Sequence, residues 1–206
     1  LYRGGRLSRT SAVVGSMINI KPFIHMDENG KLVPIGKVRG RKKSLNILVD
    51  AMAEQIKGYE EENDVIMISH GDCIEDAKYI EHLYPELVMY KVAGNCDGYG
   101  AGGTILEYID DVPIMITHGH RQHVKESYEE MWIDAIAHEA KLAVFGHTHI
   151  AYLERKDDII LLNPGSMTLP KDENLPSFAI IEIKKGEIVD IGLMQTLGNG
   201  EIHRKL

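Results

Sequence analysis

The sequence has few cysteines, few aromatic residues and no long hydrophobic run. Its 206 residues include 2 cysteines, 3 phenylalanines and 1 tryptophan. So few cysteines exclude a disulfide-stapled secreted fold and favour a reducing compartment. No apolar stretch approaches the ~18 residues that a membrane-spanning helix needs, and no apolar segment follows the first basic residues as in a signal peptide. We therefore expect a cytoplasmic protein with no membrane partner.

Charge is unevenly distributed along the chain. The net charge is −8, yet residues 1–58 hold eleven Lys and Arg against four Asp and Glu, whereas the remainder holds twelve against twenty-seven. This change of sign favours two segments of different origin. The densest basic run, residues 37–43, contains no aromatic residue that could stack on bases. We therefore expect a solvated strand end and helix start there, and no nucleic-acid partner.

The pattern of apolar residues changes near residue 64. Before it, residues 18–26 and 31–39 have the composition of a β-hairpin, and residues 44–57 carry apolar residues at helical spacing. After it, short apolar strands alternate with helices, the longest expected at residues 121–140, and an edge strand is expected from residue 188. This order predicts an α/β fold: a sandwich of mixed β-sheets flanked by helices, preceded by a hairpin-plus-helix segment. We divide the chain into residues 1–63 and 64–206.

Four polar clusters come directly after expected strands, each beside a glycine. The carboxyl edge of an α/β sheet is where ligands bind, because the loops there surround one crevice. Oxygen and nitrogen donors without thiolate suit Mn, Fe, Zn or Ni. His147 and His149 can face two metal ions bridged by Asp72, an arrangement that activates water for attack on a phosphate. The alternative is a set of ordinary polar loop residues. The clusters are Gly71-Asp72, Gly94-Asn95, Thr117-His118-Gly119-His120 and Gly146-His147-Thr148-His149.

In this order the clusters resemble the calcineurin-like metallophosphoesterases, in particular the small YfcE-like phosphodiesterases of bacteria and archaea. The resemblance covers about residues 70–195 and includes the late segment Asn163-Pro164-Gly165-Ser166. It implies that Asp72 bridges two divalent ions, Mn being expected and Ni, Fe or Zn being alternatives. The implied roles of the other residues are metal ligation by Asn95, His118, His147 and His149, and substrate binding by Asn95, His120 and Arg121.

The sequence departs from this family after the asparagine. Many relatives carry His-Glu there, with the histidine helping to protonate the leaving group, whereas this chain has Cys96-Asp97. Asp97 and His120 are then the candidate catalytic residues, and substrates with good leaving groups are favoured. The expected reaction is hydrolysis of a small phosphodiester or aryl phosphate by a metal-activated hydroxide.

The family's opening Asp-x-His motif has no counterpart in residues 1–69. Each aspartate in that stretch is followed two residues later by a residue other than histidine: Asp27, Asp50 and Asp64. One ion therefore keeps only Asp72 and His149 of its expected ligands. We expect that ion to bind weakly and hydrolysis to be impaired. The absence of the family's first strand would also expose an unpaired sheet edge. Such an edge favours association into a homo-oligomer.

Residues 1–84 instead resemble the carboxyl-terminal domain of the DegV family of fatty-acid-binding proteins. The resemblance rests on residues 4–8, 19–22, 30–32 and 37–43, and it overlaps the phosphoesterase resemblance at about residues 65–84. It implies a hybrid of two partial families. The alternative functions are a DegV-type fatty-acid-binding fragment, without the second domain that closes a lipid tunnel, and a non-catalytic remnant that holds one metal ion.

Overall fold

The computed structural model describes residues 20–26, 32–39, 43, 66–69, 74–85, 87–98, 103–167, 169–171, 175–196 and 202–205. The chain divides into two units, residues 1–65 with 197–201 and residues 66–196 with 202–206. The helix expected at residues 44–57 lies outside the described residues. No helix in the described part of the chain is both long and apolar enough to cross a membrane.

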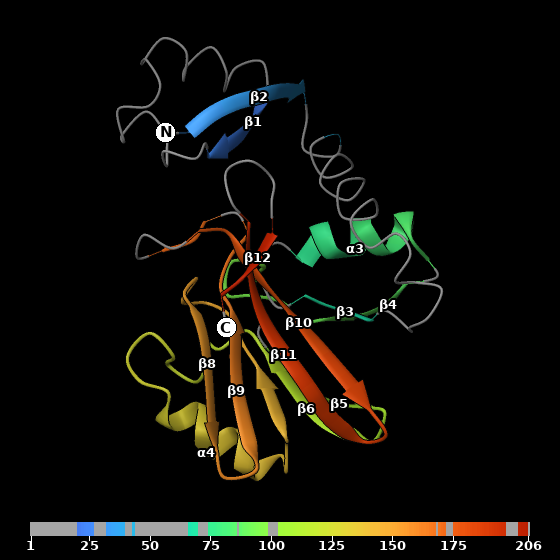
Figure 1. The fold of residues 1–206 in the computed structure, drawn as a ribbon, viewed down its shortest axis with the longest axis vertical. Helices are drawn as coiled ribbons and strands as arrows, with labels where there is room; N and C mark the ends of the chain where they lie inside the picture. The colour runs from blue at the N-terminus through green and yellow to red at the C-terminus, as the bar shows by residue number, and fades with distance from the viewer. Residues whose placement is uncertain are drawn as a thin grey trace. The chain divides into compact units, whose positions relative to one another are not determined.

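The described part of the first unit is a β-hairpin (Figure 1). Strand β1 (Ile20–Met26) pairs antiparallel with β2 (Leu32–Arg39), and the register shifts between Phe23 and Ile24. Pro22 and Pro34 fall inside these strands. Each described strand here has a single neighbour, so a proline that lacks an N–H can face the open edge. The hairpin expected from the sequence is confirmed.

A five-stranded sheet forms the centre of the second unit. Its strands are ordered β5-β6-β7-β9-β8, with β6, β7 and β9 parallel and the two outer strands antiparallel to them. Asp110 and Asp111 join β5 to β6 with φ of 46° and 62°, as a tight two-residue hairpin turn requires. The strands are β5 (Thr104–Ile109), β6 (Val112–Thr117), β7 (Leu142–Val144), β8 (Ala151–Lys156) and β9 (Ile159–Pro164).

The central strands are buried on both faces. Alternate residues of β6, β7 and β9 belong to two separate hydrophobic clusters, as the two-residue period of a strand requires. One cluster joins Ile116, Val144 and Leu162 to Ile191 and Leu193 of the second sheet. That sheet has the order β10-β11-β12, with β10 (Ser177–Lys184), β11 (Glu187–Thr196) and β12 (Ile202–Arg204). This packing confirms the predicted sandwich of mixed sheets.

The opposite face of the five-stranded sheet is covered by helix α4 (Glu129–Ala137). Met131 and Ala135 of α4 pack with Met115, Phe145 and Leu161. The expectation of one helix over residues 121–140 was wrong. His123 adopts a left-handed φ of 48° and Glu139 one of 53°, so turns replace the helix before residue 129 and end it after residue 137.

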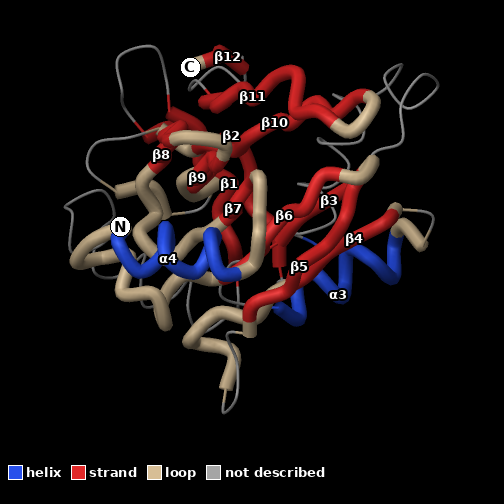
Figure 2. The backbone as a smooth tube through the Cα atoms, turned by 90° about the horizontal axis from the view of Figure 1, so that it is seen from below, coloured by secondary structure: helices blue, strands red, loops and turns tan. Residues whose placement is uncertain are grey.

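A separate strand–helix–strand unit precedes the central sheet. Strand β3 (Ile66–Ser69) pairs in parallel with β4 (Val88–Lys91), and helix α3 (Ile74–Leu83) connects them. Figure 2 shows α3 beside this pair of strands. Ile68, Tyr90 and Val92 pack into the same cluster as the sandwich core. The unit thereby places the loop after β4 on the body that carries the central sheet.

The strand expected as an edge from residue 188 is instead flanked on both sides. Strand β11 pairs with β10 along its length, and β12 pairs with its end through Met194, Gln195 and Thr196. Arg204 of β12 donates two hydrogen bonds to the carboxylate of Asp190, at 2.9 and 2.6 Å, and these bonds hold the pKa of Asp190 below its usual value. The edge prediction failed because the short strand β12 carries no long apolar run.

Candidate metal centre

Three polar clusters follow strands that end at one side of the fold. His118 comes directly after β6, and His147 lies three residues after β7. Because these two strands are parallel neighbours, their carboxyl ends meet at the same sheet edge. The N–H of Gly146 donates to the carbonyl of His118 at 3.1 Å and joins the two loops. The third cluster, at Asn95, lies in a turn after β4.

Asn95, His118 and His147 come together through one ring nitrogen. The Nε2 atom of His118 is 3.1 Å from the Oδ1 atom of Asn95 and 3.0 Å from the Nδ1 atom of His147. The side chain of His118 is 1% exposed, whereas Asn95 is at the surface. The spatial convergence expected from sequence between these residues is therefore present in the structure.

The spacing of these atoms fits a shared divalent cation. Two donors about 2.1 Å from one metal ion and at right angles to each other, as in octahedral coordination, are about 3.0 Å apart. One ring nitrogen carries at most one proton, so a single proton at Nε2 would have to serve both of its close neighbours. A cation at this place would instead accept a lone pair from each of the three atoms. An amide oxygen and two imidazoles suit a borderline divalent ion such as Mn, Fe, Ni or Zn.

His120 brings a third imidazole to this place. Its ring centroid is 5.3 Å from that of His118 and 6.0 Å from that of His147, and its Nδ1 atom is buried. The intervening Gly119 has a φ of 96°, and an added Cβ would lie 3.0 Å from Val124. A glycine at this position therefore allows the chain to turn sharply enough to bring both histidines inward.

His149 is oriented by the loop that follows β9. Its Nδ1 atom lies 2.8 Å from the carbonyl oxygen of Leu169, so that ring nitrogen carries the proton and leaves Nε2 as the lone-pair donor. Lys171 donates its backbone N–H to the carbonyl of His149 at 3.2 Å. The lone pair of Nε2 makes His149 suitable as a ligand. Among the described contacts, none joins His149 to Asn95, His118 or His147.

The turn that carries both histidines is held from behind. His147 and His149 have φ of 65° and 63°, in the left-handed region that non-glycine residues seldom adopt. Asn163, at the end of β9, donates its side-chain N–H groups to the carbonyl of Gly146 at 2.8 Å and to Oγ1 of Thr148 at 3.0 Å. The sequence marked residues 163–166 as a motif but assigned them no role.

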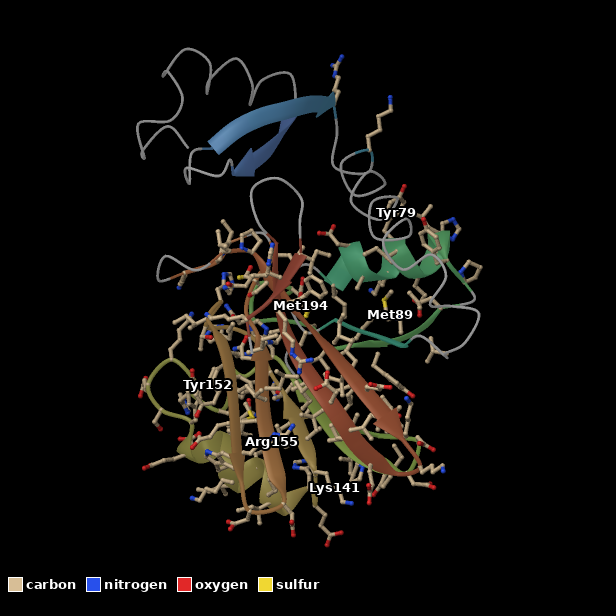
Figure 3. All side chains as sticks on the ribbon, in the orientation of Figure 1. Tyr79, Met89, Lys141, Tyr152, Arg155 and Met194 are labelled. Atoms are coloured by element: carbon tan, nitrogen blue, oxygen red, sulfur yellow. The ribbon has the colours of Figure 1, made fainter. Side chains whose placement is uncertain are left out.

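Aromatic packing supports the same turn. Phe145, directly before Gly146, is fully buried and stacks on Tyr128, their ring centroids 5.5 Å apart. Tyr128 in turn stacks on Tyr152 of β8 at 4.2 Å, and Figure 3 labels Tyr152 on that strand. Burial raises the pKa of both tyrosines, so both stay neutral at physiological pH. The base of the turn is therefore lined by aromatic rings.

Asp97 is bound to the backbone through both carboxylate oxygens. Its Oδ1 accepts the N–H of Ile74, the first residue of α3, at 2.9 Å, and its Oδ2 accepts the N–H of Gly94 at 2.8 Å. The first bond satisfies an otherwise unpartnered donor at the helix N-terminus. Asp97 therefore closes the turn that contains Asn95 and joins it to α3.

Arg121 and Asp72 are the remaining sequence-predicted residues. Arg121 is exposed and lines a pocket of about 290 Å³ beside α4, together with Gln122, Glu130, Ile133, Asp134 and Ala137. Asp72 lies outside the described residues. In the part of the chain that the structure describes, no group of three or more His, Cys, Asp or Glu is arranged to hold a metal. The three convergent donors include an asparagine, so they do not form a group of that kind.

Two families match this chain. Residues 48–186 match the calcineurin-like phosphoesterase superfamily domain, and residues 1–92 match the DegV family. Both recognitions made from the sequence are confirmed. The matched segments overlap over residues 48–92, a longer stretch than residues 65–84. The chain therefore combines a phosphoesterase domain with a DegV-family segment.

Individual relatives reflect this division. A DegV domain-containing protein of Clostridium perfringens is 40% identical over 91 residues, which make up 44% of this chain and 31% of that protein. A probable metallophosphoesterase of Mycoplasma genitalium is 28% identical over 141 residues, 66% of this chain and 82% of that protein. The chain thus spans about a third of the length of the DegV-domain relative but most of the metallophosphoesterase.

A solved structure shares the fold. Wild-type Vps29 of Entamoeba histolytica, in complex with zinc, superposes with a TM-score of 0.58 at 20% identity, covering 78% of this chain and 87% of Vps29. The likeness shows that the sheet sandwich described above shares the fold of Vps29.

Proposed function

Because the chain belongs to the calcineurin-like phosphoesterase superfamily, we propose that it is a metal-dependent phosphoesterase acting on small phosphodiesters or aryl phosphates. The observation that carries this proposal is the meeting of Asn95, His118 and His147 at one point, with donor atoms 3.0 and 3.1 Å apart. Residues far apart in the chain adopt the spacing of ligands around one cation. The proposal includes a cytoplasmic setting, which the exposed thiol of Cys96 supports.

The residues divide into ligands and substrate-binding groups. Asn95, His118 and His147 would hold one divalent ion, Mn in our proposal, with Asp72 as the bridging carboxylate and His149 facing a second ion. Divalent ions at such centres polarise a phosphoryl oxygen and supply a nucleophile from water at neutral pH. Since no Asp-x-His motif is present in residues 1–69, the second ion would have fewer protein ligands and bind more weakly.

His120 is the best-placed group to contact the substrate phosphate. Its ring lies between 5 and 7 Å, centroid to centroid, from both His118 and His147, so a phosphate held at the ion would lie within its reach. Asp97 is less suited to proton transfer, because both of its oxygens already accept backbone N–H groups. Without a second acid, the chain would hydrolyse substrates whose leaving groups need no protonation.

Hydrolysis of bis(p-nitrophenyl) phosphate tests the proposal. The full chain is stripped with a chelator, dialysed, and assayed with and without added Mn²⁺. We expect turnover only with the metal, and its loss in a His147→Ala variant. The matched control is His203→Ala, which removes an exposed histidine of β12 and should keep full activity. Equal activity of the His147→Ala and wild-type proteins, or turnover that persists in chelator, would contradict the proposal.

The DegV-family segment supports a second candidate, fatty-acid binding. Residues 1–92 match that family, and the described hairpin β1–β2 lies inside the match. Mass spectrometry of lipid extracted from the purified chain tests it. A fatty acid present in about equimolar amount, with no Mn²⁺-dependent hydrolysis, would favour this candidate over the first.

A further inference from the structure

Asn163 uses its whole side-chain amide inside the protein. The residue is 0% exposed. Its Nδ2 donates to Gly146 O at 2.8 Å and to Thr148 Oγ1 at 3.0 Å, and its Oδ1 accepts the N–H of Gly165 at 3.0 Å. Both amide hydrogens are therefore used. A buried amide with fixed partners on two loops defines where those loops lie relative to each other.

The two donor bonds fall on either side of His147. Gly146 precedes this histidine and Thr148 follows it, so the amide binds the backbone carbonyl before a residue with a left-handed φ of 65° and the side-chain hydroxyl of the residue after it. The hydroxyl of Thr148 also accepts the N–H of Ile150 at 3.1 Å, which carries the restraint past His149. Conformations of this kind are strained and persist only where the surroundings enforce them.

We propose that Asn163 is a positioning residue for the histidine ligands: it holds the 146–149 turn in the strained form that aims His147 at His118. This inference rests on the proposed function. Asn163 touches neither the donor atoms of the centre nor the substrate position, and acts through the turn. Outer groups that orient metal ligands typically contribute 10- to 100-fold to metal affinity.

The Asn163→Asp variant isolates the donor bonds. Aspartate has the same shape and keeps an acceptor for the N–H of Gly165, but it places a carboxylate oxygen against the carbonyl of Gly146. We expect the affinity of the full chain for Mn²⁺, measured by calorimetry, to fall about 10- to 100-fold. The visible absorption spectrum of bound Co²⁺ should also change, because it reports the geometry of the ligands.

Ser177→Ala is the matched control. Ser177 is buried and donates to the carbonyl of Pro164 at 2.7 Å, so it holds the same strand end without a bond to residues 146–149. A general loss of packing at this strand end would weaken metal binding in both variants. We expect the Ser177→Ala protein to unfold at a lower temperature yet to bind Mn²⁺ within about twofold of wild type and to keep the Co²⁺ spectrum.

A second variant keeps the proposal testable if Asn163→Asp does not fold. Thr148→Val removes one of the two acceptors and leaves Asn163 bonded to Gly146, so a smaller loss of Mn²⁺ affinity is expected. Unchanged affinity and an unchanged Co²⁺ spectrum in the folded variants would overturn the positioning role, even though the wild-type chain binds metal. If the wild-type chain itself binds neither Mn²⁺ nor Co²⁺, the proposed function fails as well.

Discussion

The two sides of the candidate centre are held in different ways. The histidine side comprises residues 117–120 and 146–149, which follow β6 and β7, and the asparagine side is the turn of residues 94–97 after β4. On the first side His118 and the supporting Asn163 are 1% and 0% exposed. On the second side Asn95 and Cys96 are exposed. The centre therefore joins a buried half to an open half.

The difference follows from the sheets. Strands β6, β7 and β9 are buried on both faces, by the second sheet and by α4. The loops at their ends are therefore anchored on close-packed, rigid strands. Strand β4 pairs with β3 alone among the described strands, and its loop depends on the two bonds of Asp97 instead. The histidine side should accordingly dominate metal affinity, and the asparagine side should tune it.

Removing one ligand from each side tests this ranking. His118→Ala deletes the nitrogen that neighbours both other donors, and we expect Mn²⁺ affinity to fall at least about 100-fold. Asn95→Ala deletes an exposed amide oxygen that water can replace, and the expected loss is about 10-fold. Calorimetric titration of both variants measures the effects. Equal losses, or a larger one for Asn95→Ala, would show that burial does not decide the ranking.

Gly165→Ala strains the support of the histidine side. Gly165 has a φ of 86°, and an added Cβ would lie 2.0 Å from Ser177 Oγ and 3.2 Å from the backbone nitrogen of Ala151. We expect the free energy of unfolding to fall by about 2–4 kcal/mol, as measured by urea denaturation. Gly103→Ala, where nothing lies within 4 Å of the added Cβ, is the control. A shift under about 0.5 kcal/mol for Gly165→Ala would contradict the packing described here.

Asp97→Ala removes the support of the asparagine side. Two backbone N–H groups lose their acceptor, one of them at a helix N-terminus, and stability should fall by about 1–2 kcal/mol. The pH dependence of kcat separates this role from proton donation. If Asp97 were the acid, its loss would abolish the alkaline limb of the profile; we expect the limb to remain.

The smallest expected effect lies away from both sides, in the turn before α4. His123 Nδ1 is 2.9 Å from Glu130 Oε2, and this hydrogen bond raises the pKa of His123 above its ordinary 6.5. The folded state therefore gains stability that is fully present below pH 6.5 and disappears as pH rises through the raised pKa. Both side chains are exposed, so the gain is small. An NMR titration of Glu130→Gln should show a lower pKa for His123 than in the wild-type chain; no change would refute the pairing.

The sequence predicted the strands better than the ends of the helices. Apolar runs such as residues 142–144 and 159–162 are buried on both faces, so composition alone identifies them. The start of α4 was missed by eight residues because the left-handed His123 has no signature of its own in the sequence. Strand β12 was missed because its pairing with β11 is set by tertiary contact.

The sequence predicted that three of the candidate residues converge, and the structure brings Asn95, His118 and His147 together. Each cluster alone was a weak signal; their order along the chain after successive strands made them specific, and the roles of these residues as ligands stay a prediction. The supporting role of Asn163 could not be read, since an asparagine before Pro-Gly equally suits an ordinary turn. Arg121, placed near the phosphate by resemblance, lines the pocket beside α4, and its contact with the phosphate stays a prediction.

Counting the metal ions that the chain retains tests the account most directly. The purified full chain is loaded with Mn²⁺, dialysed extensively and analysed by mass spectrometry for metal per chain, beside His118→Ala. The account predicts one retained ion per wild-type chain and close to none in the variant, because the ligands of only one position are complete. Two retained ions per chain, or one ion that survives the loss of His118, would contradict it.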